Sequence, residues 1–262
     1  MCRSIPRYDP LDIPSWMKDF VTQPLEVYGN VDSNRRKTWA RYDCSSFENS
    51  LLNHGIPQIC SENILSAVGI HIGKVDIIGT VAHTTSKEAS VQTIRDWSTL
   101  ISMEKNGPVP YVTNDGTTLE SAFLRTILGD TCPANDWTPR QVTDADLQDW
   151  KTIISPPFDQ TLSYDQMVFP TTLYSQLWER RFFVTDTGFM GVGPLNMQYG
   201  DEVWALFGSL MPFVLRPLHC DDSQSARTRI AYHSVVEECY VHGIMYGQAI
   251  RDGVKEQLVF LK

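Results

Sequence analysis

The sequence predicts an α+β protein in which a mixed helical and strand-containing N-terminal part packs on a small antiparallel β-sheet or barrel-like C-terminal part. Between residues 91 and 154, apolar residues recur at helical spacing. After Arg180, short apolar runs alternate with Gly, Pro and Asp turn signals, which is typical of an antiparallel sheet. We therefore divide the chain into a connector-like segment (1–35), a mixed α+β region (36–179) and a small β-rich domain (180–262).

The composition and net charge of the chain exclude several classes of protein. The chain has 262 residues, 42% of them hydrophobic, which is enough for a sizeable core. The net charge of -9 argues against a nucleic-acid partner, because phosphate contacts need clustered Lys and Arg. No apolar run is long enough to form a membrane span, and no secretory signal is visible. We expect a soluble cytoplasmic protein with free cysteines and no cofactor or metal.

The N-terminal part begins with a Pro-rich stretch that we read as a connector laid on a surface. Dense β-branched and aromatic residues predict strands in 37–47 and 64–81. The second of these stretches contains three glycines that are candidate bulges or turns: Gly69, Gly73 and Gly79.

Helices should follow. The repeat of Val91, Ile94 and Trp97 places Trp97 on the buried face of the first one. Thr117 and Glu120 have capping-box spacing and predict the start of a second, which Gly129 would end.

A third helix should begin at Thr143 and end before Pro156. Its early carboxylates, including Asp144 and Asp146, complement the helix dipole and are interpreted as structural. A shorter fourth helix is expected over Pro170–Glu179, with proline at its first position.

The last part of the chain is predicted to consist of strands and turns. The expected strands are 181–186, 189–192, 202–207, 213–215 and 230–241, with 219–228 as the longest loop. Gly188, Gly191 and Gly193 resemble a phosphate-binding loop. A β-turn is preferred, because Pro194 follows at once and no third glycine completes GxGxxG.

Few residues of the sequence are candidates for a catalytic site. Cys239 and His242 lie three apart, so a small hydrolase-like enzyme would need them together with Arg216 around one pocket. Glu237 and Glu238 would point to opposite faces of a strand. If one is buried, we expect Arg181 or Arg216 as its partner.

Four segments together resemble the C-terminal region of fungal heterokaryon incompatibility (HET) proteins in their order and spacing. They are 180–194 (RRFFVTDTGFMGVGP), 200–201 (GD), 212–217 (PFVLRP) and 238–245 (ECYVHGIM). The resemblance extends more loosely to 13–16, 69–79, Trp97 and 119–130. It implies structural or recognition roles for Arg181, Asp186, Gly188, Gly193, Gly200, Asp201, Arg216, Glu238, Tyr240, His242 and Gly243.

This sequence departs from the family at two points. Glu237, Tyr246 and Gln248 replace a glycine and an acidic pair that the family usually shows. The motifs of the family's N-terminal HET domain, the part associated with triggering cell death, do not occur.

The resemblance thus implies a non-enzymatic C-terminal module involved in fungal self/non-self recognition and linked cell death. It would be regulatory or would bind a protein partner or a HET effector domain in cis. Two alternatives stay open: a hydrolase-like enzyme with a cleft near Cys239 and His242, and a truncated product without independent function.

Overall fold

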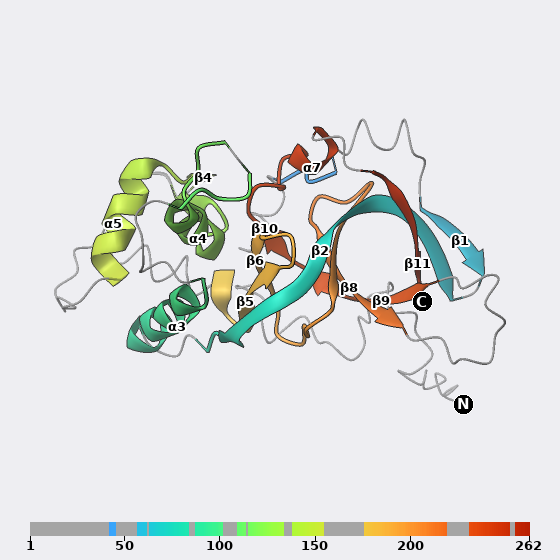
Figure 1. The fold of residues 1–262 in the computed structure, drawn as a ribbon, viewed down its shortest axis with the longest axis horizontal. Coiled ribbons are helices and arrows are strands. Elements are labelled where there is room, and N and C mark those ends of the chain that lie inside the picture. Colours follow the sequence, from blue (N-terminus) through green and yellow to red (C-terminus); the bar gives the residue numbers. More distant parts are fainter. Residues whose placement is uncertain are drawn as a thin grey trace, which may run out of the picture.

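The structure is a computed structural model that describes residues 42–45, 57–61, 63–83, 87–101, 109–113, 115–133, 138–154, 176–218, 231–251 and 255–262. Figure 1 shows helices α3 (Lys87–Leu100), α4 (Leu119–Ile127) and α5 (Asp144–Ile154) grouped on one side of the molecule and a strongly curved sheet on the other. The expected α+β class with a barrel-like sheet is confirmed.

The main sheet contains nine strands within the described residues. They are β1 (Gln58–Ser61), β2 (Ile64–Val81), β5 (Arg180–Thr185), β6 (Met190–Pro194), β7 (Glu202–Leu206), β8 (Phe213–Leu218), β9 (Tyr232–Glu238), β10 (Tyr240–Val241) and β11 (Gln257–Leu261). A separate hairpin pairs β3 (Thr131–Pro133) with β4 (Pro139–Gln141).

Five strands of this sheet close into a ring. From β2 the pairing runs through β11, β9, β8 and β7, and β7 pairs again with β2. β2 pairs with β11 through residues 65–69 and with β7 through residues 69–74. The far end of β2 leaves the ring and pairs with β5, which continues to β6 and β10. β2 therefore belongs both to the ring and to the sheet extension (Figure 1). Since β2 precedes residue 180, the sheet draws strands from both sides of the boundary expected there.

The glycines of β2 permit close contacts without ending the strand. A Cβ at Gly79 would collide with the Trp97 indole, and one at Gly73 would come within 2.6 Å of Thr187 Oγ1. The pairing with β7 shifts register between His71 and Gly73, and the pairing with β5 shifts between Ile78 and Val81. The expected irregularities are thus present at Gly73 and Gly79, within one continuous strand.

The helices are α3 (Lys87–Leu100), α4 (Leu119–Ile127), α5 (Asp144–Ile154) and the short α7 (Gln248–Arg251). Trp97 of α3 is fully buried and stacks on Phe182 of β5, with ring centroids 5.9 Å apart. Phe123 of α4 meets the same ring edge-on at 5.4 Å. The first core therefore lies between the helices and the β5–β6 face.

The interior of the ring forms a separate core. Each ring strand contributes at least one side chain to it: Ala67, Trp204, Leu206, Leu215, Val235, Val259 and Leu261. A further cluster joins β2, β5, β7 and β8 to α7 and includes Ile70, Phe183, Val203, Val214 and Ala249.

Several predictions need correction. The N-cap of the second helix is Thr118, whose side chain accepts from Ser121 N, because Thr117 is held in a turn by Asp115 and Tyr111. Gly191 and Gly193 lie inside β6, and only Gly188 (φ +90°) occupies the predicted turn.

The predicted strand over 37–47 is wrong for residues 42–45, where Asp43 N donates to Met245 O and Cys44 N to Leu210 O across loops. The connector, the loop 219–228 and the rest of that strand lie outside the described residues, as does the fourth helix except for its last turn. Among the described residues, no helix has the length and apolar character needed to cross a membrane.

Candidate functional site

A cleft of about 660 Å³ lies between the helices and the β10 end of the sheet. One wall comes from the start of α4, the β3–β4 hairpin and the start of α5. The other wall comes from β10 and the turns that lead to α7. The lining residues are mostly polar: Asp115, Gly116, Thr117, Thr118, Ser121, Arg125, Asp130, Gln141, Val142, Asp144, Tyr240, His242, Gly243, Met245, Tyr246 and Gln248.

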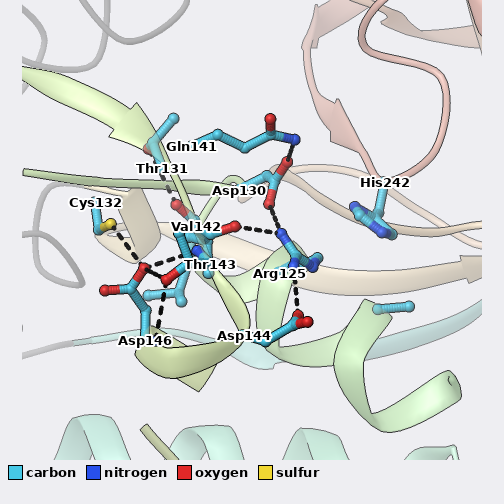
Figure 2. Close-up of polar contacts among 12 residues, drawn as sticks. Arg125, Asp130, Thr131, Cys132, Gln141, Val142, Thr143, Asp144, Asp146 and His242 are labelled. Atoms are coloured by element: carbon cyan, nitrogen blue, oxygen red, sulfur yellow. Dashed lines mark hydrogen bonds and ion pairs between the residues drawn. The ribbon is translucent and has the colours of Figure 1, made fainter. Parts of the chain in front are cut away.

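Arg125 is the centre of the helical wall. Its Nη1 donates to Asp130 Oδ1 at 2.7 Å and to Val142 O at 2.6 Å, and its Nη2 donates to Asp144 Oδ1 at 3.1 Å. Burial opposes the charge, but the two carboxylates raise the pKa of Arg125 overall, so it stays protonated. Figure 2 shows Arg125 between these partners, with His242 on the opposite wall of the cleft.

Asp130 is placed by the end of α4. Gly129 and Asp130 both have left-handed backbone conformations (φ +58° and +49°), which turn the chain back over the helix. The Asp130 side chain is 5% exposed, and its second oxygen accepts from Gln141 Nε2 at 2.7 Å. Both oxygens are therefore satisfied, as burial requires.

The sheet wall is organised around His242. Its Nδ1 lies 3.1 Å from Tyr240 Oη, and its carbonyl accepts from the buried Tyr111 hydroxyl at 3.1 Å. Tyr111 also accepts from Met190 N at 2.9 Å, so one hydroxyl joins the loop before α4 to two segments of the sheet. Burial lowers the pKa of His242 to about 4, so its ring is neutral at pH 7.

The neighbouring polar group in Figure 2 is a helix cap. Asp146 accepts from Thr143 N and Thr143 Oγ1, while Asp146 N lies 3.4 Å from the Thr143 hydroxyl. Arg140 donates to both oxygens of Asp146 at 2.7 Å and, chiefly by these hydrogen bonds, holds the pKa of Asp146 well below its usual range. The structural role predicted for Asp146 is confirmed.

Only three of the family-motif residues line this cleft, namely Tyr240, His242 and Gly243. Gly243 has φ +92°, and a Cβ there would collide with the Thr113 methyl group. The loop before α4 can therefore approach the sheet closely at this position.

The other motif residues fix the strands and loops of the sheet. The buried Asp201 forms an ion pair with the partly exposed Arg216, and Arg181 Nε donates to Gly79 O at 2.9 Å. Asp186 Oδ1 accepts from Lys74 N at 2.8 Å. Positive φ favours glycine at Gly188 and Gly200, and Gly193 packs against the flexible end of Met197. Glu238 accepts from Arg180 through its carbonyl.

The geometry does not assemble the hydrolase-like set. Cys239 is buried in the core, where burial raises its pKa strongly, and it does not line the cleft. Arg216 is bound to Asp201 instead. The burial on which the glutamate prediction depends does not occur at Glu237, whose half-exposed side chain pairs with Arg180 at 2.5 Å. Within the described residues, no group of three or more possible metal ligands occurs.

Sequence reasoning missed Arg125 and Gln141 as parts of a site. Arg125 and Asp130 are only five residues apart, so their pairing across a helix end could have been considered. Gln141 reaches Asp130 because β3 pairs with β4 with Thr131 opposite Gln141. The sequence carries no recognisable signal for that short hairpin.

These features define an α+β protein with a closed strand ring and a sheet extension covered by helices. A polar cleft lies between the helices and the β10 end of the sheet. Residues 163–261 match the family described as the Het-6 beta-barrel domain. This match supports the resemblance to a fungal heterokaryon incompatibility-type family that the motifs show. No curated protein and no solved structure matches the chain.

Proposed function

We propose that the chain is a non-enzymatic recognition or regulatory module of the heterokaryon incompatibility response, linked to cell death through its partner. The cleft is the proposed docking site, and its occupant is a protein partner or a HET effector domain in cis. The observation that carries the proposal is that the motif Tyr240–Gly243 forms one wall of this cleft.

The chemistry of the cleft supports binding over catalysis. Arg125 is bonded to two carboxylates and a carbonyl, and His242 is neutral and buried. The thiol nearest in sequence, Cys239, is sealed in the core. A polar, hydrogen-bonding cleft without an activated nucleophile suits a protein segment.

The test expresses the chain alone and joined to a HET domain in fungal cells, with cell death measured by a vital dye. Death is expected only with the joined protein. Death caused by the chain alone would contradict a regulatory role.

A charge reversal in the cleft tests the docking site. Asp144→Lys changes a cleft side chain that is 93% exposed, and Asp149→Lys changes an exposed carboxylate of the same helix outside the cleft. We expect only Asp144→Lys to alter death by the joined protein while both variants keep the wild-type circular dichroism spectrum. Equal effects of the two would remove the cleft from the proposal.

A further inference from the structure

A second buried polar cluster lies in the ring, away from the cleft. Glu202 of β7 accepts from Trp204 Nε1 at 3.1 Å, and His233 Nε2 of β9 lies 3.0 Å from the same oxygen, Oε2. His71 Nε2 of β2 lies 3.9 Å from it. Three ring strands therefore meet at one carboxylate oxygen.

The histidines of this cluster are incompletely satisfied. The His233 side chain is 8% exposed, and that of Glu202 is 12% exposed. His71 Nε2 and His233 Nδ1 are both buried, and neither has a hydrogen-bond partner among the residues described. A buried polar atom without a hydrogen-bond partner lowers the stability of the folded state, because it has lost its contact with water. A charge placed on such a group in the interior costs still more.

The charges around His71 come from several elements. Glu202 lies on β7, His233 on β9 and Asp186 at the end of β5, while Lys74 of β2 itself places Nζ 3.5 Å from Glu202 Oε1. Burial opposes the charge of Glu202, but hydrogen bonds from His233 and Trp204 hold its pKa at about 2. Glu202 and Lys74 thus balance each other directly, and Asp186 adds a second negative charge, so burial is the main factor that disfavours a proton on His71.

The cluster sits where the ring closes. His71 pairs with Trp204 across β2 and β7, their rings are 5.1 Å apart, and the register shifts immediately after His71. The β2–β7 pairing is the one that closes the ring. Its residues are 69–74 on β2 and 202–206 on β7, which we call the seam.

We propose that protonation of His71, which faces Glu202 and His233 at the seam, separates β2 from β7, so that the ring opens there in mild acid. This conformational response is independent of the proposed docking role of the cleft. Burial lowers the pKa of His71, so the closed seam resists a proton that an open seam accepts at the ordinary value of 6.5. The opening constant therefore rises as pH falls below 6.5, by up to about tenfold per pH unit, until the closed form also binds the proton.

Amide hydrogen exchange between pH 7.5 and 5, corrected for the intrinsic pH dependence of exchange, tests this proposal. In the wild-type chain, exchange of the seam amides should become faster at pH 5, by up to about thirtyfold for a group with an ordinary pKa of 6.5, while amides of β5 and β6 change less. His71→Gln should abolish the difference. His83→Gln, which changes an exposed histidine just beyond the other end of β2, should leave it intact.

Three outcomes would overturn the proposal. They are a seam whose exchange is independent of pH, a His71→Gln variant that responds as the wild type does, and equal acceleration at β5 and β6, which would mean global unfolding. NMR titration of the histidine rings in the wild-type chain needs no variant. A His71 ring that titrates at or above its ordinary pKa would also exclude the mechanism.

Discussion

Arg216 donates two parallel hydrogen bonds to Asp201, from Nε to Oδ1 at 2.8 Å and from Nη2 to Oδ2 at 2.9 Å. Asp201 is 2% exposed, and its Oδ2 also accepts from the backbone Gln198 N at 2.7 Å. Arg216 also reaches Asn196 O at 2.8 Å. The pair therefore joins β8 to the whole loop between β6 and β7.

Arg216→Met should lower the free energy of unfolding by about 3 kcal/mol, because it leaves a buried carboxylate without its cation. Urea unfolding followed by circular dichroism measures the loss. Arg140→Met is the matched control, since Arg140 makes the same two-bond contact with Asp146 but is 41% exposed. It should cost about 1 kcal/mol or less. Equal losses would mean that burial of Asp201 does not determine the strength of the pair.

Gly243→Ala should destabilise the chain by about 3 kcal/mol, from a left-handed backbone and a collision with the Thr113 methyl group. Thr113→Ser removes that methyl and keeps the hydroxyl that donates to Asp115. The double variant should recover the steric part of the loss. Gly200 has φ +82° and open space around it, so Gly200→Ala measures the destabilisation that comes from the backbone conformation alone. If the double variant recovers no stability, the collision with the Thr113 methyl group does not contribute to the loss.

Tyr111→Phe should cost about 2 kcal/mol, because the lost hydroxyl leaves Met190 N–H and His242 C=O without this partner. Thermal unfolding and amide exchange at Met190 measure the effect. Tyr199→Phe changes a tyrosine that is 70% exposed and should stay within about 0.5 kcal/mol of wild type. A similar loss in both variants would exclude the bridging role of Tyr111.

Stability should fall in acid because of His242. Its pKa is about 4 in the folded chain and 6.5 ordinarily, so the unfolded chain binds the proton first as pH falls from 6.5 to 4. The free energy of unfolding should drop by up to about 3 kcal/mol over this range. His242→Gln should reduce the slope, and His83→Gln should not. An unchanged slope in His242→Gln would contradict the burial of a neutral imidazole.

Local signals predicted the elements well. Trp97 and Trp150 lie at helical spacing with their apolar neighbours, and both are fully buried in α3 and α5. The start of α4 was misplaced by one residue because Thr117 and Thr118 are both good caps. The choice depends on Tyr111 N, which binds Thr117 O and holds it in the preceding turn.

Long-range contacts set the limit of prediction. Gly73 and Gly79 were predicted to be bulges or turns, but the side chains that need their small size, Thr187 and Trp97, come from other elements. The cleft could not be predicted from the sequence for the same reason. Its walls join Arg125 to His242 from segments more than a hundred residues apart, and no local pattern records that approach.

The sharing of β2 between the ring and its extension decides which recombinant fragments can fold. A fragment cut to residues 163–261 would contain β7 and β11 but lose the strand that pairs with both. Their open edges would then be free to add strands from neighbouring molecules, a common route to aggregation. A recombinant fragment that contains the closed ring therefore has to begin upstream of residue 64.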